Sequence, residues 1–147
     1  MNQQKNTRSS LFLIELMIAI LFFALGSTVC IQVFVKAYTV DQDAKKLSFA
    51  SLQASSAASA LKYTDGSPAS MKEYFPLITQ ENGELVVYYD KNFHSCEKKD
   101  SLFSLHINVK QKNQTVFAGI RMEEKSRTKP VYELELRYPA LERPGEL

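Results

Sequence analysis

The first third of the chain carries a nearly continuous run of apolar residues. The run begins at Leu11 and continues with few polar breaks to Val35, about 25 residues. At about 1.5 Å of rise per residue, a helix of that length spans the hydrocarbon core of a bilayer, which is about 30 Å thick. The pattern therefore predicts a membrane-spanning helix over residues 11–36.

After Lys36 the pattern becomes that of an amphipathic helix. Apolar residues recur at spacings of three and four or their sums, namely Val40, Ala44, Leu47, Ala54, Ala58 and Leu61. We therefore expect the helix to continue over residues 37–62. The stretch 49–60 is rich in Ala and Ser, which lets a sheet approach closely. A flexible linker and a small coiled-coil stalk are the alternatives, but Leu47, Leu52 and Leu61 favour a packed helix.

Residues 63–147 read as a β-rich head. The turn-forming sequence at residues 64–68 ends the helix, and residues 70–75 predict one helical turn. Period-two alternation then predicts strands over 102–110 and 131–138, and an aromatic and β-branched run predicts a strand over 84–90. A turn at 111–114 leads to a further expected strand over 115–122. Short connections favour an antiparallel meander. The expected fold is α+β, a long N-terminal helix packed against an antiparallel sheet of about four strands.

The charges near the N-terminus predict the orientation of the membrane segment. Residues 1–10 contain Lys5 and Arg8 and no acid, so this leader is expected to stay in the cytoplasm while the head lies outside. The formal net charge of the 147-residue chain is only +2, and no dense basic stretch occurs, so no nucleic-acid partner is predicted. Cys30 and Cys96 lie in different segments, which argues against a disulfide between them.

Glu15 is the exception within the apolar run. A carboxylate in such a segment costs about 2.5–3.5 kcal/mol even on the lenient insertion scales, so it indicates a function and needs a partner. The run itself has no Lys, Arg or His. A cleaved signal peptide, with a passable site at Ala24-Leu25-Gly26, leaves Glu15 unexplained, and so does a simple uncleaved anchor.

The segment Ser9-Ser10-Leu11-Phe12-Leu13-Ile14-Glu15-Leu16-Met17 resembles the processing site of type IV prepilins and pseudopilins. The resemblance covers residues 5–38. It implies cleavage between Ser10 and Leu11 by a prepilin peptidase and N-methylation of Leu11. Ser10 stands where the family usually has Gly, and Leu11 where it usually has Phe.

The same resemblance implies a role in assembly for Glu15. The α-ammonium group that cleavage creates at Leu11 can meet the Glu15 carboxylate of a neighbouring subunit, which offsets the cost of burying that carboxylate. The implied function is a structural subunit, a minor pilin or pseudopilin, of a type IV pilus, type II secretion or competence filament. The implied partners are other pilin-like subunits, the peptidase/methylase, membrane lipid and, indirectly, a platform membrane protein and an assembly ATPase.

The head offers few candidates for chemistry. We expect His106 to be a solvated strand residue, the pair His94 and Cys96 to lie in an ordinary surface loop, and Glu133 and Glu135 to face solvent. Asp90, Glu97 and Asp100 lack the spacing of a calcium loop, so no metal or cofactor is predicted. The chain is not expected to be an enzyme. The alternative function is an uncleaved, single-pass membrane anchor that carries an extracytoplasmic binding module.

Overall fold

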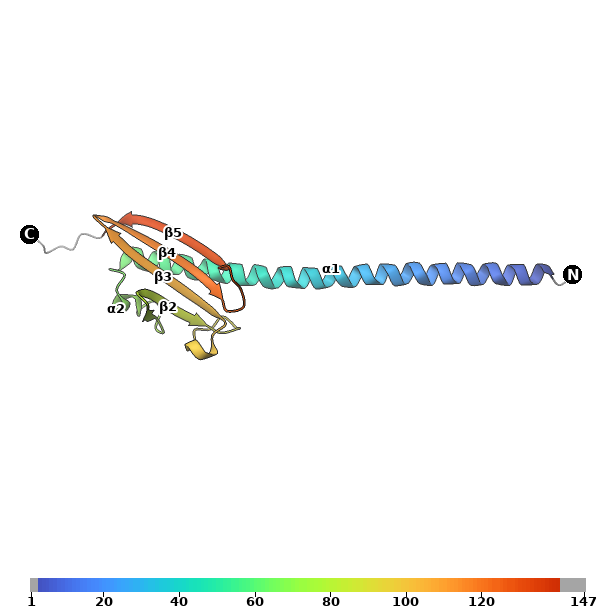
Figure 1. The fold of residues 1–147 in the computed structure, drawn as a ribbon, viewed down its shortest axis with the longest axis horizontal. Helices are drawn as coiled ribbons and strands as arrows, with labels where there is room; N and C mark the ends of the chain where they lie inside the picture. Colours follow the sequence, from blue (N-terminus) through green and yellow to red (C-terminus); the bar gives the residue numbers. More distant parts are fainter. Residues whose placement is uncertain (1–2, 141–147) are drawn as a thin grey trace, which may run out of the picture. The chain divides into compact units, whose positions relative to one another are not determined.

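The structure is a computed structural model that describes residues 3–140, with side chains from residue 8 onward. Its first element is the 61-residue helix α1, Gln3–Tyr63 (Figure 1). The expected helix over residues 11–62 lies within α1, which also includes part of the leader. The chain divides into two units, Met1–Asp43 and Ala44–Leu147, so α1 begins in the first and ends in the second.

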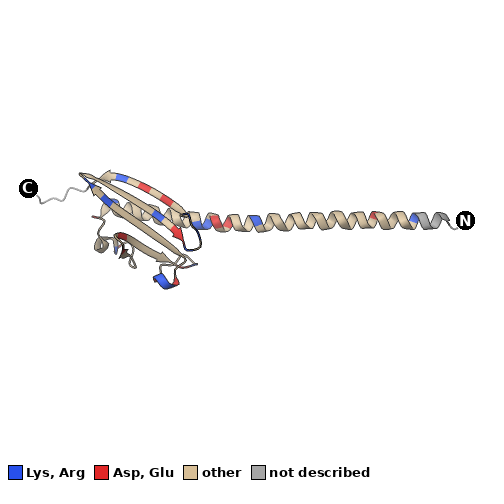
Figure 2. Ribbon diagram, viewed as in Figure 1, with Lys and Arg blue, Asp and Glu red and all other residues tan. Residues whose placement is uncertain are grey.

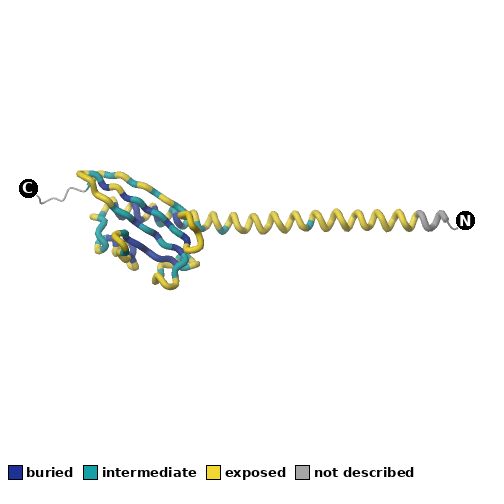
Figure 3. Tube along the Cα trace, viewed as in Figure 1, coloured by how far each residue is buried: buried dark blue, intermediate teal, exposed yellow. Residues whose placement is uncertain are grey.

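In the first unit, the described side chains of α1 are almost all exposed. Every residue from Arg8 to Val40 except Ser27 is exposed (Figure 3). The hydroxyls of Ser27 and Thr28 each donate to the backbone carbonyl four residues earlier, at 2.9 Å. Such bonds satisfy polar side chains without water, as a lipid environment requires. Helix α1 is long and apolar enough to cross a membrane.

The second unit contains the antiparallel sheet (Figure 1), so the expected α+β fold is confirmed. Its five strands lie in the order β1-β2-β3-β4-β5, and each pairs with its sequence neighbours. Their bounds are Thr79–Glu81, Glu84–Tyr89, Phe103–Lys112, Thr115–Glu124 and Tyr132–Pro139. The sequence pattern missed the short strand β1, because three residues are too few to show an alternation.

Two tight turns set the register of the sheet. Asn82 and Gly83 join β1 to β2 with φ of 52° and 84°, the left-handed values that a two-residue type I′ hairpin needs. Between β3 and β4, Lys112 pairs with Thr115, so only Asn113 and Gln114 lie outside the ladder. The expected four-residue turn at 111–114 is therefore wrong, because backbone pairing extends both strands.

The core lies between the C-terminal part of α1 and one face of the sheet. The helix contributes mainly alanines, with Ala50, Ala54 and Ala57 each 0% exposed, and the sheet contributes Leu105, Ile107, Ile120 and Met122. Small side chains allow the helix backbone to approach the sheet closely. Of the apolar positions that predicted the packed face, Ala54, Ala58 and Leu61 are buried as expected, whereas Val40, Ala44 and Leu47 are exposed.

A short segment after α1 completes the core. Helix α2, Pro68–Met71, starts two residues before the expected helical turn because Ser67 caps it, accepting from the backbone N–H of Ser70. Met71, Phe75 and Ile78 are all buried. The 3₁₀ helix η1, Lys98–Asp100, lies in the connection from β2 to β3.

Candidate functional site

The three residues of the proposed processing and assembly segment lie on α1. Ser10, Leu11 and Glu15 are all helical and exposed. Leu11 and Glu15 are four residues apart, so they occupy the same side of adjacent turns, about 6 Å apart along the axis. The backbone nitrogen of Leu11 therefore lies about one helical turn from that of Glu15.

Glu15 is isolated from other charges along its helix. Between Arg8 and Lys36 it is the only residue with a formal charge (Figure 2). Arg8 is seven residues away, which is about 10 Å along the axis. Lys5 belongs to the residues whose side chains the structure leaves undescribed. Within the span itself, the carboxylate has no basic residue to neutralise it.

The outward face of the sheet carries a polar cluster that joins β2, β3 and β4. Glu84 accepts from both terminal nitrogens of Arg121, at 2.8 and 3.2 Å, and from the amide of Asn108 at 3.1 Å. His106 Nδ1 lies 3.3 Å from Glu84 Oε2, and its Nε2 lies 3.0 Å from Ser104 Oγ. The His106 side chain is 20% exposed, so the expectation of a solvated histidine is wrong. Cross-strand neighbours shield it.

Opposing effects act on the Glu84 carboxyl within this cluster. Burial alone raises its pKa, but the bond from Asn108 and the nearby charge of Arg121 together lower it below the ordinary value. Glu84 is therefore an ionised anchor for three polar side chains, and the cluster holds the strands in register. Sequence alternation placed Ser104, His106 and Asn108 on one face of their strand, but no local signal identified their contacts with Glu84 and Arg121.

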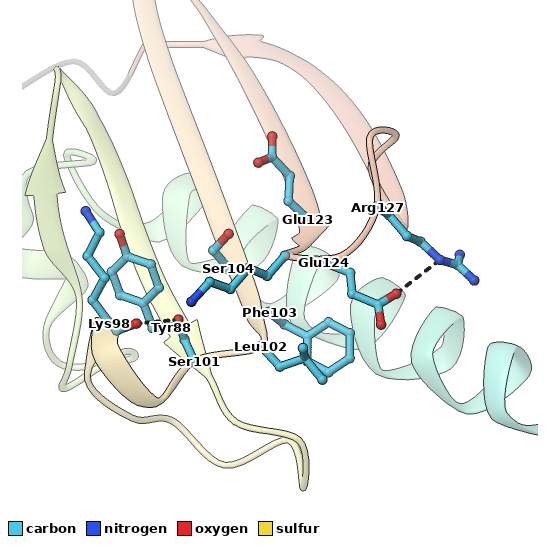
Figure 4. Close-up of a pocket in the computed structure, with 10 residues that line it drawn as sticks. Tyr88, Lys98, Ser101, Leu102, Phe103, Ser104, Glu123, Glu124 and Arg127 are labelled. Atoms are coloured by element: carbon cyan, nitrogen blue, oxygen red, sulfur yellow. Dashed lines mark hydrogen bonds and ion pairs between the residues drawn. The ribbon is translucent and has the colours of Figure 1, made fainter.

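A second cluster ties α1 to the end of β4. Glu124 is only 5% exposed, and its Oε1 accepts from Lys46 Nζ at 2.7 Å. Its Oε2 lies 3.1 Å from Arg127 Nε, as Figure 4 shows. Glu124 and Arg127 line a cavity of about 310 Å³, together with residues from β2, η1 and β3 that include Tyr88, Lys98 and Ser104. The ion pair between Lys46 and the buried carboxylate of Glu124 was not predicted from the sequence.

The remaining candidates from the sequence are not brought into a reactive arrangement. Asp90 Oδ1 accepts from the backbone N–H groups of Asn92 and His94, and these bonds lower the pKa of Asp90. Burial raises the pKa of the Cys96 thiol, which disfavours a nucleophilic thiolate. Glu133 and Glu135 are exposed, as expected. Within residues 3–140, no group of three His, Cys, Asp or Glu side chains could hold a metal ion.

The chain was also compared with known proteins. No protein-family model, curated protein or solved structure matches it.

Proposed function

We propose that this chain is a structural subunit of a pilin-like filament, a minor pilin or pseudopilin. Its leader would be removed between Ser10 and Leu11, its N-terminal end would lie on the cytoplasmic side, and its head would lie outside the membrane. The filament could belong to a type IV pilus, a type II secretion system or a competence apparatus.

The observation that carries the proposal is the position of Glu15. It is an exposed carboxylate in the middle of exposed apolar side chains, on a helix able to span a membrane. In lipid such a group needs a cation, and no basic residue lies between it and Lys36. Cleavage would remove Arg8 and create an α-ammonium group at Leu11. That cation, on the same or a neighbouring subunit, would be able to neutralise Glu15.

The role proposed for Glu15 is recognition during assembly. A carboxylate that is neutralised only when another subunit docks in register favours assembled over unassembled subunits. The proposed partners are other pilin-like subunits, which contact the exposed apolar part of α1, and a peptidase/methylase that acts on the leader. A platform membrane protein and an assembly ATPase would act indirectly.

Processing provides the first test. The full chain should be expressed in cells with an active prepilin peptidase, extracted from the membrane and measured as an intact protein by mass spectrometry. We expect a chain that begins with N-methyl-Leu11. A chain that still begins at Met1, or one trimmed after Gly26, would contradict the proposal.

Assembly provides the second test. Glu15→Ala removes the carboxylate and should leave membrane insertion intact or improved, while incorporation into filaments falls at least tenfold. Gln32→Ala is a matched control, because it removes another exposed polar side chain from the same apolar run. Equal incorporation of Glu15→Ala and the wild type would contradict the role assigned to Glu15.

The second candidate is a membrane-anchored binding module that keeps its leader. It is favoured by the open hollows on the head, of about 310 and 270 Å³, which could hold a ligand. The same mass measurement separates the two functions, because this alternative requires an N-terminus at Met1.

A further inference from the structure

A glycine lies in the middle of β4, on the outward face of the sheet. Gly119 pairs with Asn108 on β3 and with Glu135 on β5, in registers that run without a break along both ladders. Glycine inside a strand weakens it, and usually marks a bulge, a bend or a place where another group approaches the backbone closely. The unbroken register excludes a bulge, and the φ of Gly119 is not positive. A bend of β4 and the close approach of another group remain as reasons, and the open space above Gly119 is compatible with the second.

No group of this chain makes that approach among the described residues. A Cβ added at Gly119 would meet no other atom within 4 Å. The space above Gly119 is a hollow of about 270 Å³, lined by side chains of β3, β4 and β5 that include Lys110, Phe117 and Glu135. This volume is just below the usual range of about 300–1,000 Å³ for small-molecule pockets, so one ring-sized group fits.

The lining of the hollow combines an apolar floor with a polar rim. Gly119 and the 40% exposed Phe117 form the apolar part. The guanidinium of Arg137 lies 5.4 Å from the centroid of the Phe117 ring, and the positions of Lys110, Phe117 and Arg137 are adjacent across the three strands. Of the charged residues that line the hollow, Lys110 can donate hydrogen bonds and Glu135 can accept them. A ligand there needs an apolar surface and several hydroxyl or amide groups.

The two charged residues that line the hollow, Lys110 and Glu135, have opposite signs, which favours a neutral ligand. The outward faces of β2 to β5 carry four carboxylates, Glu84, Glu123, Glu133 and Glu135, and four cations, Lys110, Lys112, Arg121 and Arg137. With the charges balanced, neither a polyanion nor a polycation gains from the surface as a whole. We propose that the hollow over Gly119 binds one neutral sugar ring of an oligosaccharide. Such binding requires only the folded head, whether or not the leader is removed.

The test uses the full chain in a zwitterionic detergent, because detergents with sugar head groups would compete. Chitotriose, cellotriose and maltotriose are titrated by calorimetry and by saturation-transfer NMR. We expect at least one of them to bind with a millimolar or lower Kd. The proposal is overturned if none of the three sugars binds at a concentration ten times a millimolar Kd.

Gly119→Val fills the hollow from its floor. Because the added Cβ meets open space and valine favours strands, the variant should fold with an equal or higher Tm while sugar affinity falls at least 10-fold. Thr115→Val is the matched control on the outward face of β4, two rows from Gly119, and should bind as the wild type does.

Two outcomes of the variant experiment would overturn the sugar site. The first is undiminished binding by Gly119→Val, which would place the sugar elsewhere. The second is a change of self-association on Gly119→Val with no effect on sugars, seen by sedimentation, which would make the hollow a contact between protein chains. A variant that fails to fold is detected by circular dichroism, and Glu135→Gln and Lys110→Ala then serve as the test, each expected to weaken binding at least threefold.

Discussion

Arg121 on β4 reaches over β3 to Glu84 on β2, with Nη2 2.8 Å from Oε2 and Nη1 3.2 Å from Oε1. One bidentate ion pair thus connects two strands that do not pair with each other. Such a two-pronged contact also fixes geometry, because both nitrogens of the guanidinium must face both oxygens. The pair therefore helps to hold β2, β3 and β4 in their observed register.

Removal of Arg121 should destabilise the head modestly. Because Arg121 is 37% exposed, solvent screens part of the attraction, and we expect Arg121→Ala to lower the free energy of unfolding by about 1 kcal/mol. Urea unfolding followed by tyrosine fluorescence measures the loss. The double variant with Glu84→Ala should lose less than the sum of the two single changes. Strict additivity would show that the two side chains are not coupled.

The same carboxyl makes stability depend on acidity. The pKa of Glu84 is lower in the folded head than its ordinary value, so ionised Glu84 stabilises the fold above that ordinary value. This contribution is lost as the pH falls through the lowered pKa. Unfolding measured from pH 7 down to pH 3 should therefore show a shallower loss of stability in Glu84→Gln than in the wild type. If the stability of both proteins falls equally with pH, Glu84 is not the group that makes stability depend on acidity.

The buried carboxylate of Glu124 should be more sensitive to the loss of its cation. Lys46→Ala removes the cation 2.7 Å from the 5% exposed Glu124 carboxylate and leaves the ion pair with the more exposed Arg127, and we expect a loss of about 2 kcal/mol of unfolding free energy. Lys62→Ala removes an exposed lysine from the same helix and is the control, with an expected change below about 0.5 kcal/mol. Equal effects of the two changes would argue against the ion pair as the cause.

The close contact between α1 and the sheet predicts intolerance of larger side chains. Ala57 is fully buried, so Ala57→Leu should destabilise the head by about 1–3 kcal/mol through overpacking. Ser55→Leu places the same side chain on the exposed side of the helix and should change stability by less than about 0.5 kcal/mol. Thermal unfolding of both variants tests the contrast. A stable Ala57→Leu would mean that the helix can move away from the sheet.

The alternation of apolar and polar residues along β3 was sufficient to predict which of its side chains face the core. Phe103, Leu105 and Ile107 point into the core, and the intervening Ser104, His106 and Asn108 point outward, as their period of two predicts. On α1 the periodicity was right at Ala54, Ala58 and Leu61, which are buried, and wrong at Leu47, which is 49% exposed. Hydrophobicity ranks residues by their gain from burial, but the distance between helix and sheet selects the small ones.

By itself, the sequence determined the apolar helix with its single carboxylate, the amphipathic continuation and the four longer strands, because each is a local pattern that neighbouring residues define. Only the tertiary structure decided that Arg121 meets Glu84, that Glu124 is buried against Lys46 and that a hollow opens over Gly119. These features join residues tens of positions apart, and their contacts depend on strand register and on the packing of α1, which no short segment of the chain contains.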